Sequence, residues 1–352
     1  MYRSNYYLVV MAGGSGTRFW PKSTSKRPKQ LLSFSGDRTD TLLVQTLSRF
    51  DGIVAPENRY VVTTRMLKDS IAEQAPGVSI LAEPQGRNTA ACVYWAARVV
   101  AQKDPKGIML VMPSDHYIPK EASFRATVNT AAEWAAANDH LVTLGIKPTR
   151  PETGYGYLRM GSQMGGPDSP RRVEAFVEKP NIDKARVYVQ FEQYLWNGGM
   201  FIWRADVILD AFDRFMPEMK KAWEKAEENV DVAYPNMTAT SIDYGVMEKV
   251  DNVVTYPLDC GWDDLGSWLS LEGLALVLGA KKGGSTVTGG ELLAVQSEGN
   301  IIDTPGKVVA LLGISDLIVV EHNDVIMIAP KDRSQDIRMI VDQVKKIKPE
   351  LA

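Results

Sequence analysis

Short uncharged runs alternate with helical patterns over the first 145 residues. The first run, Tyr6 to Met11, is rich in aromatic and β-branched residues, as expected of a strand buried on both faces. Helical periodicity is plainest over 89–101 and 124–137. This alternation predicts an α/β fold with a mixed, mostly parallel sheet and helices on both faces. Further strands are expected at residues 59–64, 79–81, 107–112 and 140–144.

The pattern changes after residue 145. Residues 151–180 are rich in glycine and proline, and we expect a substrate-covering section with short strands of its own. A helix over 267–279 and a linker over 281–290 are expected next. The remainder reads as an all-β unit, with short strands at 307–312, 316–321 and 324–329, followed by an amphipathic helix at 332–348.

At 352 residues, the chain is long enough for a large α/β domain and a smaller one, placed here at 1–280 and 281–352. Its formal net charge of −3 gives no electrostatic case for a nucleic acid partner. No apolar run approaches the length of a membrane span and no secretory signal precedes the first strand, so we expect a cytoplasmic protein with no membrane partner. Cys92 and Cys260 are too few for a disulfide framework, and both are expected to be buried thiols.

Three glycines, Gly13, Gly14 and Gly16, follow the first strand directly. Without Cβ atoms they allow a sharp turn that brings backbone N–H groups close to an anion. Thr17 and Arg18 add a hydroxyl and a permanent cation. The spacing differs from the P-loop and from the dinucleotide-binding fingerprint. It predicts another kind of phosphate-holding loop, although a plain tight turn has the same composition.

Two acidic sites are candidate metal ligands. Asp115 follows a buried strand directly, at the edge of the sheet where ligands bind in α/β proteins. A carboxylate there suits Mg²⁺ bridging phosphates, and it equally suits a helix cap or a turn. Asp263 and Asp264 lie among glycines and large aromatic residues, where burial is costly unless a cation pairs with them. Together the two sites predict a metal clamp.

Cations follow the glycine loop closely. Such a run is commonly a solvated loop face, but its closeness to Arg18 favours a polyphosphate partner. The three histidines have no spacing that suggests a nucleophile triad, which fits a displacement at phosphorus without a protein nucleophile. The cations are Lys22, Lys26, Arg27 and Lys29, with Lys179 at the end of a later apolar run.

Taken in order, these motifs resemble one family, the bacterial mannose-1-phosphate guanylyltransferases, and the match runs nearly end to end. Each motif is weak alone, but their order and spacing together are specific. They are residues 13–21, 28–30, 83–90, 113–116, 145–157, 177–180, 196–201 and 262–268.

The resemblance implies a Rossmann-like nucleotidyltransferase domain of the GT-A-like type and a small, β-helix-like C-terminal domain ending in a helix. It also implies transfer of GMP from GTP to α-D-mannose 1-phosphate, with Mg²⁺ or Mn²⁺ as cofactor and release of pyrophosphate. A homodimer is expected on the same ground. Two departures are visible. Ala91 and Cys92 stand where many relatives have a proline, and the isomerase domain of longer relatives does not follow Ala352, so we expect no isomerase activity.

The same resemblance assigns roles to residues. In the catalytic set, Asp115 and Asp264 are the metal ligands, with Asp263 as the alternative, while Arg18 and Lys29 offset charge on the departing pyrophosphate. Lys179 would hold the phosphate of the sugar, and Glu178 would accept hydrogen bonds from its hydroxyls. The nucleotide-binding set is Ala12, Gly13, Gly14, Ser15, Gly16, Thr17, Arg18, Glu83, Gly86, Arg87, Asn88 and Ser114, and the sugar-phosphate set is Tyr155, Gly156, Glu178, Lys179, Asn197 and Gly198.

Two other functions stay open from the sequence. A guanylyltransferase for another sugar 1-phosphate, such as a heptose, would need the same loop and the same carboxylates. A non-catalytic sugar-nucleotide sensor would keep the fold, but we expect such a protein to have a broken loop or no metal carboxylates. The residues that argue against a sensor are Arg18, Lys29, Asp115, Asp264 and Lys179.

Overall fold

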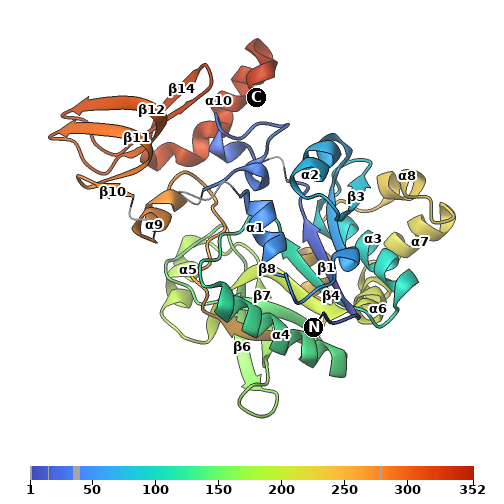
Figure 1. Ribbon diagram of the computed structural model, residues 1–352. Coiled ribbons are helices and arrows are strands. Elements are labelled where there is room, and N and C mark those ends of the chain that lie inside the picture. The colour runs from blue at the N-terminus through green and yellow to red at the C-terminus, as the bar shows by residue number, and fades with distance from the viewer. Residues whose placement is uncertain (1, 15, 35–39, 278–279) are drawn as a thin grey trace. The chain divides into compact units, whose positions relative to one another are not determined.

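A computed structural model describes residues 2–14, 16–34, 40–277 and 280–352 (Figure 1). The chain forms two compact units, and neither is continuous in sequence. Because the glycine-rich loop belongs to the same unit as the C-terminal region, folding joins the two ends of the sequence. Unit 1 comprises Met1–Gly13, Thr46–Ser114 and Ile118–Trp262, and unit 2 comprises Gly14–Gln45, Asp115–Tyr117 and Asp263–Ala352.

Unit 1 is built on a nine-stranded mixed sheet of order β3-β2-β1-β4-β8-β5-β9-β7-β6. β1 lies in the middle of the parallel part, where Val9 pairs with Tyr60 on one side and Val111 on the other. Of these strands, β7 and β8 run opposite to the rest. The predicted α/β fold with a mostly parallel sheet is thus confirmed. The strands are β1 (Tyr6–Met11), β2 (Arg59–Thr64), β3 (Ser79–Glu83), β4 (Ile108–Pro113), β5 (Leu141–Ile146), β6 (Tyr157–Gln163), β7 (Arg171–Val177), β8 (Tyr194–Arg204) and β9 (Val253–Leu258).

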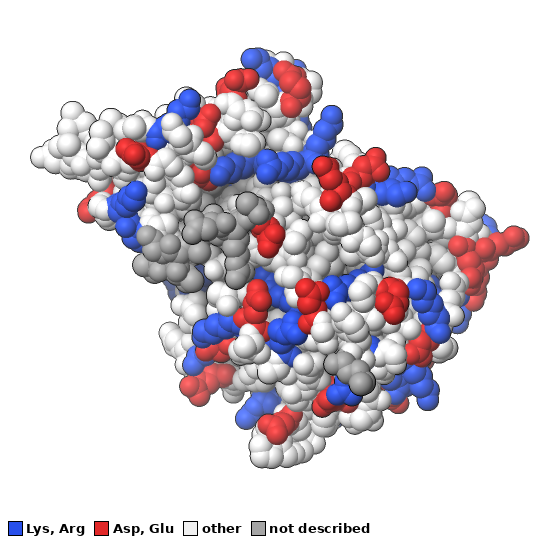
Figure 2. All heavy atoms as spheres, viewed as in Figure 1, with Lys and Arg blue, Asp and Glu red and all other residues white. Residues whose placement is uncertain are grey.

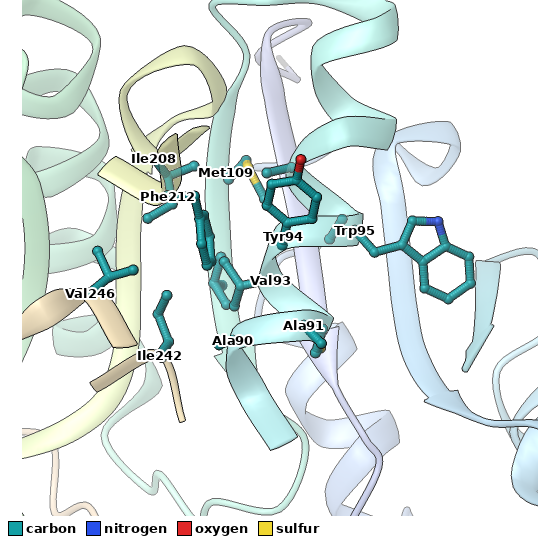
Figure 3. Close-up of a cluster of buried hydrophobic side chains, with 14 of the residues drawn as sticks. Ala90, Ala91, Val93, Tyr94, Trp95, Met109, Ile208, Phe212, Ile242 and Val246 are labelled. Atoms are coloured by element: carbon teal, nitrogen blue, oxygen red, sulfur yellow. The ribbon is translucent and has the colours of Figure 1, made fainter. Parts of the chain in front are cut away.

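Packed layers lie on both faces of this sheet. On one face, α3 (Asn88–Lys103) packs against α6 (Ala205–Phe215), and the rings of Tyr94 and Phe212 meet edge to face at 5.2 Å (Figure 3). The alternate residues of β1, Leu8 and Val10, are also buried but lie outside that cluster. Part of the second layer comes from α4 (Glu121–Ala137), which contacts β4, β5, β8 and β9. The sequence predicted both α3 and α4.

The remaining helices are shorter than α3 and α4. The strands expected within 151–180 do form, as β6 and β7, but they extend the main sheet. Cys92 and Cys260 are both buried and free, as expected. The other helices of the described chain are α1 (Leu42–Ser48), α2 (Lys68–Gln74), α5 (Ile182–Val189), α7 (Pro217–Lys225), α8 (Val230–Ala233), α9 (Ser270–Val277) and α10 (Ile337–Ile347).

Unit 2 contains a five-stranded sheet of order β10-β11-β12-β13-β14, so the expected β-rich C-terminal region is confirmed. The linker predicted over 281–290 is wrong, because β10 and the first half of β11 occupy it. Gly283 and Gly284 both have positive φ, 52° and 74°, and form the two-residue loop of an antiparallel hairpin. The strands are β10 (Lys281–Lys282), β11 (Ser285–Val295), β12 (Ile301–Leu312), β13 (Leu317–His322) and β14 (Val325–Pro330).

The C-terminal amphipathic helix is shorter than predicted. Residues Lys331–Asp336 form 3₁₀ turns, and the α-helix α10 begins only at Ile337. Its buried residues Ile337 and Val341 join a core with Phe19, Trp20 and other residues of unit 2. The expected 267–279 helix is present as α9, with residues 278 and 279 outside the described residues.

Charged side chains of both signs are mixed over the face shown in Figure 2. This distribution agrees with the small formal net charge of −3. Within the described residues, no helix combines the length and the apolar character that crossing a membrane would need.

Candidate active site

A cavity of about 430 Å³ in unit 2 brings together residues from three separate stretches of sequence. Most of the predicted phosphate and metal residues line it, and so does His116, for which the sequence suggested no role. The glycine loop, a basic side chain and two carboxylates thus share one cavity. The lining residues are Gly14, Gly16, Thr17, Arg18, Phe19, Lys29, Asp115, His116, Asp264, Leu265 and Gly266.

Lys29 is the most heavily bonded side chain of this cavity. Its side chain is only 11% exposed, and its Nζ lies 2.8 Å from Asp115 Oδ2. The same Nζ donates hydrogen bonds to the backbone carbonyls of Asp264 and Leu265. Burial alone would raise the pKa of Asp115, but the Lys29 ammonium, helped by His116, holds it below its usual value. Asp115 is therefore kept ionised, as a metal ligand must be.

The glycine loop lies against the backbone of Lys29 and the side chain of Gln30. Gly16 has φ of 50°, and a Cβ on it would lie 2.5 Å from the Lys29 backbone nitrogen. Gln30 Nε2 donates a 3.2 Å hydrogen bond to the Gly14 carbonyl. Arg18 reaches the far wall, where its Nη1 donates to Gly266 O at 3.1 Å. Ser15, predicted as part of the same loop, lies outside the described residues.

The structure distinguishes the two adjacent aspartates. Asp264 lines the cavity, whereas Asp263 Oδ1 accepts a 2.7 Å hydrogen bond from the backbone N–H of Leu265. The Asp263 backbone also pairs with that of Tyr117, which ties the segment carrying Asp115 to the segment carrying Asp264. Two carboxylates in one cavity offer the hard oxygen donors that divalent cations such as Mg²⁺ prefer, so the donor set fits such an ion.

The predicted nucleoside residues lie in unit 1. Glu83, at the end of β3, is buried and accepts a hydrogen bond from the hydroxyl of Tyr234, a residue that the sequence did not suggest. Burial raises the pKa of Glu83 and the Tyr234 hydrogen bond opposes that rise. Gly13 approaches the same carboxylate, since a Cβ there would lie 2.9 Å from Glu83 Oε2.

The other predicted nucleotide residues of unit 1 do not all join Glu83. Arg87 Nη2 donates to the Pro235 carbonyl, and Asn88 has φ of 61° with its side chain bonded to the Thr89 N–H. Gly86 has open space where a Cβ would stand. Ala12 and Ser114 are buried and held by backbone hydrogen bonds to Val62 and Met11.

Most of the predicted sugar-phosphate residues form a second cluster in unit 1. Lys179 Nζ lies 2.7 Å from Glu178 Oε1, and the Asn197 N–H donates to the Gly156 carbonyl at 2.8 Å. A Cβ on Gly156 would overlap Glu178 Oε2, so a larger residue there would displace the carboxylate from its present position. Asp243, which the sequence did not suggest, accepts a hydrogen bond from Asn197.

Two predicted residues border this cluster. Tyr155 lies in an aromatic group, with ring centroids 5.2 Å from Trp196 and 5.3 Å from Trp262, and its hydroxyl accepts a 3.2 Å hydrogen bond from Arg150. Gly198 follows Asn197 in β8, where a Cβ would crowd the Leu144 carbonyl at 3.1 Å. Arg150 is a further cation that the sequence analysis did not single out.

A mixed, mostly parallel sheet whose first strand leads into a glycine loop, together with a cavity holding a lysine and two carboxylates, defines an α/β protein suited to phosphate esters. A family model described as nucleotidyl transferase matches residues 7–278. A second, described as the MannoseP isomerase/GMP-like beta-helix domain, matches residues 290–344. The fold class predicted from the sequence is confirmed by both, and the nucleotidyltransferase family generally uses a divalent metal.

Curated relatives show which nucleotidyltransferases the chain resembles. The alginate biosynthesis protein AlgA of Pseudomonas aeruginosa is 38% identical, with 95% of this chain and 71% of that protein aligned. A mannose-1-phosphate guanylyltransferase of Escherichia coli K12 is 37% identical over 98% of this chain and 74% of the relative. The chain belongs to the family of these mannose-1-phosphate guanylyltransferases.

Solved structures agree with this placement. A crystal structure described as mannose-1-phosphate geranyltransferase from Thermus thermophilus is 34% identical, with a TM-score of 0.87 over 97% of this chain and 99% of that one. A structure described as mannose-6-phosphate isomerase from Helicobacter pylori has a TM-score of 0.59 at 22% identity, covering 73% of this chain and 99% of that one. The second likeness concerns the fold alone.

Gly16→Ala should destabilise unit 2, because alanine is strained at φ of 50° and its Cβ would meet the Lys29 backbone. We expect the free energy of unfolding to fall by about 2 kcal/mol or more. Gly14→Ala is the matched control, since nothing lies within 4 Å of a Cβ there. Urea unfolding of both variants measures the difference, and equal losses would show that the Lys29 contact is unimportant.

Tyr234→Phe should destabilise unit 1 in a pH-dependent way. Without the hydroxyl the buried carboxylate of Glu83 loses a donor that favours its ionised form, so its pKa rises further. The variant is then penalised most at high pH: we expect a loss of about 1–3 kcal/mol at pH 8 and a smaller one at pH 5. Denaturation at both values checks this, with the exposed Tyr244→Phe as control. A loss independent of pH would contradict it.

Proposed function

We propose that this protein transfers GMP from GTP to α-D-mannose 1-phosphate, forming GDP-mannose and pyrophosphate. The observation that carries the proposal is the unit 2 cavity, in which a glycine loop, Lys29 and two carboxylates meet. Its support from relatives is the 36–38% identity to proteins of this activity and of polysaccharide biosynthesis along nearly the whole chain.

In the proposed reaction a phosphate oxygen of mannose 1-phosphate attacks the α-phosphorus of GTP in line. A new P–O bond forms, the bond from the α-phosphorus to the bridging oxygen of the β-phosphate breaks, and pyrophosphate leaves with that electron pair. The nucleophile belongs to the substrate. The protein therefore has to orient two anions and stabilise charge on the leaving group, for which no protein nucleophile is required.

Residues of unit 2 would handle the triphosphate. The backbone N–H groups of Gly14 and of residues 16–18 suit its oxygens, and Arg18 and Lys29 supply positive charge for the departing pyrophosphate. Asp115 and Asp264 would hold Mg²⁺ or Mn²⁺, with Asp263 disfavoured because its carboxylate is bonded to the Leu265 N–H. When bound, such an ion neutralises phosphate charge and polarises the phosphoryl group.

Residues of unit 1 would select the nucleoside and the sugar. We assign Glu83, with Gly86, Arg87 and Asn88, to the base and ribose. Glu178 is suited to sugar hydroxyls because a buried carboxylate accepts hydrogen bonds only in defined directions. Lys179, more than half exposed beside it, would bind the phosphate of the sugar. Tyr155, Gly156, Asn197 and Gly198 complete this proposed set.

Other predictions stay open. These are a cytoplasmic location, a homodimer and the absence of nucleic acid and membrane partners. The predicted domain boundary at residue 280 is supported by the two family models, which end and begin at residues 278 and 290. The alternative sugar 1-phosphates and the non-catalytic sensor are outcomes of the experiment below.

Pyrophosphate release tests the proposal. With Mg²⁺ present, we expect rapid release only from GTP with mannose 1-phosphate. Glucose 1-phosphate, a heptose 1-phosphate, and ATP or dTTP in place of GTP are the comparisons. Release with another sugar would keep the mechanism and change the substrate. No release from any pair would favour a sensor.

A pair of neighbouring variants tests the metal ligands. Asp264→Asn should lower kcat roughly 100- to 1000-fold and weaken Mn²⁺ binding measured by electron paramagnetic resonance. Asp263→Asn is the matched control, because its amide oxygen can still accept from the Leu265 N–H, so it should stay near the wild type. The opposite order of effects would move the ligand to Asp263, and circular dichroism shows whether both variants fold.

A further inference from the structure

The amide of Asn197 is held in one orientation by three neighbours. Its Oδ1 accepts hydrogen bonds from the Gly199 N–H and from the Thr143 hydroxyl, both at 3.2 Å. Its Nδ2 donates to Asp243 Oδ1 at 2.8 Å. A backbone N–H can only donate and an ionised carboxylate can only accept, so a flipped amide would face two mismatched partners. Gly199 and Asp243 therefore define which way the amide points.

An amide nitrogen carries two N–H groups, and the bond to Asp243 uses one of them. The second N–H has no hydrogen-bond partner among the described residues. Asn197 is partly exposed, and its backbone N–H bonds to the carbonyl of Gly156, the glycine that leaves room for Glu178. The remaining N–H is thus a donor of fixed direction within the cluster that also contains Glu178.

Asp243 is itself rigidly placed. It begins a single π-helical turn, Asp243–Met247, a geometry that is rare and is frequently found at functional sites. Ile242, which precedes the turn, and Val246, within it, are buried and point into the core beside α3 and α6 (Figure 3). The Ile242 N–H also donates to Thr89 Oγ1 at 2.9 Å. The core therefore anchors the turn from which the carboxylate projects.

We propose that Asp243 is a positioning residue for sugar recognition: through Asn197 Nδ2 it aims the second amide N–H at an oxygen of the hexose 1-phosphate. This inference rests on the proposed function for the identity of the ligand. Asp243 has no part in the proposed triphosphate and metal site of unit 2, so its role would be an additional one. Asp243 does not touch the ligand in this scheme, and it acts only through the amide that it orients.

The surroundings of Asp243 make its effect dependent on pH. Burial and the neighbouring Glu178 carboxylate raise the pKa of Asp243 to about 6, while a backbone hydrogen bond, the hydrogen bond from Asn197 and the charge of Lys179 oppose that rise. Above this pH the carboxylate is ionised and gives a charge-assisted hydrogen bond. Below it the carboxyl group is neutral, accepts more weakly and carries a proton of its own, so it defines the amide less well.

Steady-state kinetics on the full chain test the inference. Asp243→Ala should raise KM for mannose 1-phosphate about tenfold or more, with KM for GTP changed less than about twofold. Asp243→Asn keeps an acceptor of the same size and should recover part of the loss. The exposed Asp251→Asn, which also removes one carboxylate, is the matched control and should match the wild type. Equal rises in both KM values would overturn the positioning role.

The pH dependence of KM distinguishes the titration of Asp243 from the titration of the substrate phosphate. In the wild type, KM for mannose 1-phosphate should rise as the pH falls from 7.5 to 5. Titration of the sugar phosphate affects the KM of the wild type and of Asp243→Asn equally. The ratio of the two KM values therefore reports the titration of Asp243 alone, and it should change near pH 6. A constant ratio would overturn the inference.

A structural readout keeps the inference testable if the proposed reaction fails. Asn-selective ¹⁵N labelling should show distinct, exchange-protected side-chain amide signals for Asn197, assigned with Asn197→Ala. Those signals should be lost or averaged in Asp243→Ala and unchanged in Asp251→Asn. Unchanged signals in Asp243→Ala would overturn positioning, whatever the activity. Lack of turnover and of mannose 1-phosphate binding in the wild type would instead count against the proposed function.

Discussion

The buried ammonium of Lys29 is the interaction on which the pocket of unit 2 depends. A buried charge is tolerated only when it is paired and hydrogen-bonded. Lys29 meets this need with the Asp115 carboxylate and the carbonyls of Asp264 and Leu265, which come from two other parts of the chain. Its backbone nitrogen also sets the closest approach of Gly16. Through its backbone and its side chain, Lys29 thus fixes the glycine loop, Asp115 and the Asp264 segment relative to one another.

The pKa of Asp115 in unit 2 is shifted in the opposite direction from the pKa values of Glu83 and Asp243 in unit 1. In unit 2, Lys29 and His116 outweigh burial and lower the pKa of Asp115, which favours a charged ligand for a cation. In unit 1, burial dominates and raises the pKa of both Glu83 and Asp243. Their main partners are a phenol and an amide, which are neutral donors suited to directional hydrogen bonds. Asp115 and the pair Glu83 and Asp243 therefore lie in different electrostatic surroundings.

Sequence patterns predicted the elements whose side chains repeat regularly. β1, β4 and β5 were found because strands buried on both faces are mostly apolar. β2 and β3 were found as short strand-like runs between helical patterns, and α3 and α4 because their apolar residues recur at helical spacing. β8 was not found, since its Asn197-Gly198-Gly199 segment resembles a loop. In the structure that segment coincides with a register shift against β5, and Gly199 has φ of 62°. Asn197 and Gly198, which are expected to bind the sugar phosphate, interrupt the apolar pattern by which β8 could have been predicted.

The site was predictable where it is local in sequence and unpredictable where it is not. The glycine loop, Asp115 and Asp264 lie in compact motifs, and the structure brings them together. Tyr234 meets Glu83 from 151 residues away, and Asp243 meets Asn197 from 46 residues away. Hydrophobic periodicity is a local pattern, so it does not predict contacts between residues that are far apart in the sequence. The 281–290 segment was misread for a related reason, because the same glycines and small polar residues suit a hairpin and a linker.

The core of unit 2 has a consequence for the order of events during synthesis. Phe19 and Trp20, just after the glycine loop, pack with Ile318, Met327 and Val341, and Trp20 Nε1 donates to the Leu351 carbonyl 331 residues further on. Domains generally fold as units while the chain is made from its N-terminus. Phe19 and Trp20 therefore cannot reach their final packing until residues 318–351 have also been translated. The glycine loop is thus the earliest part of this pocket to be made, and removal of residues 318–351 would take away the packing partners of the two aromatic residues that follow it.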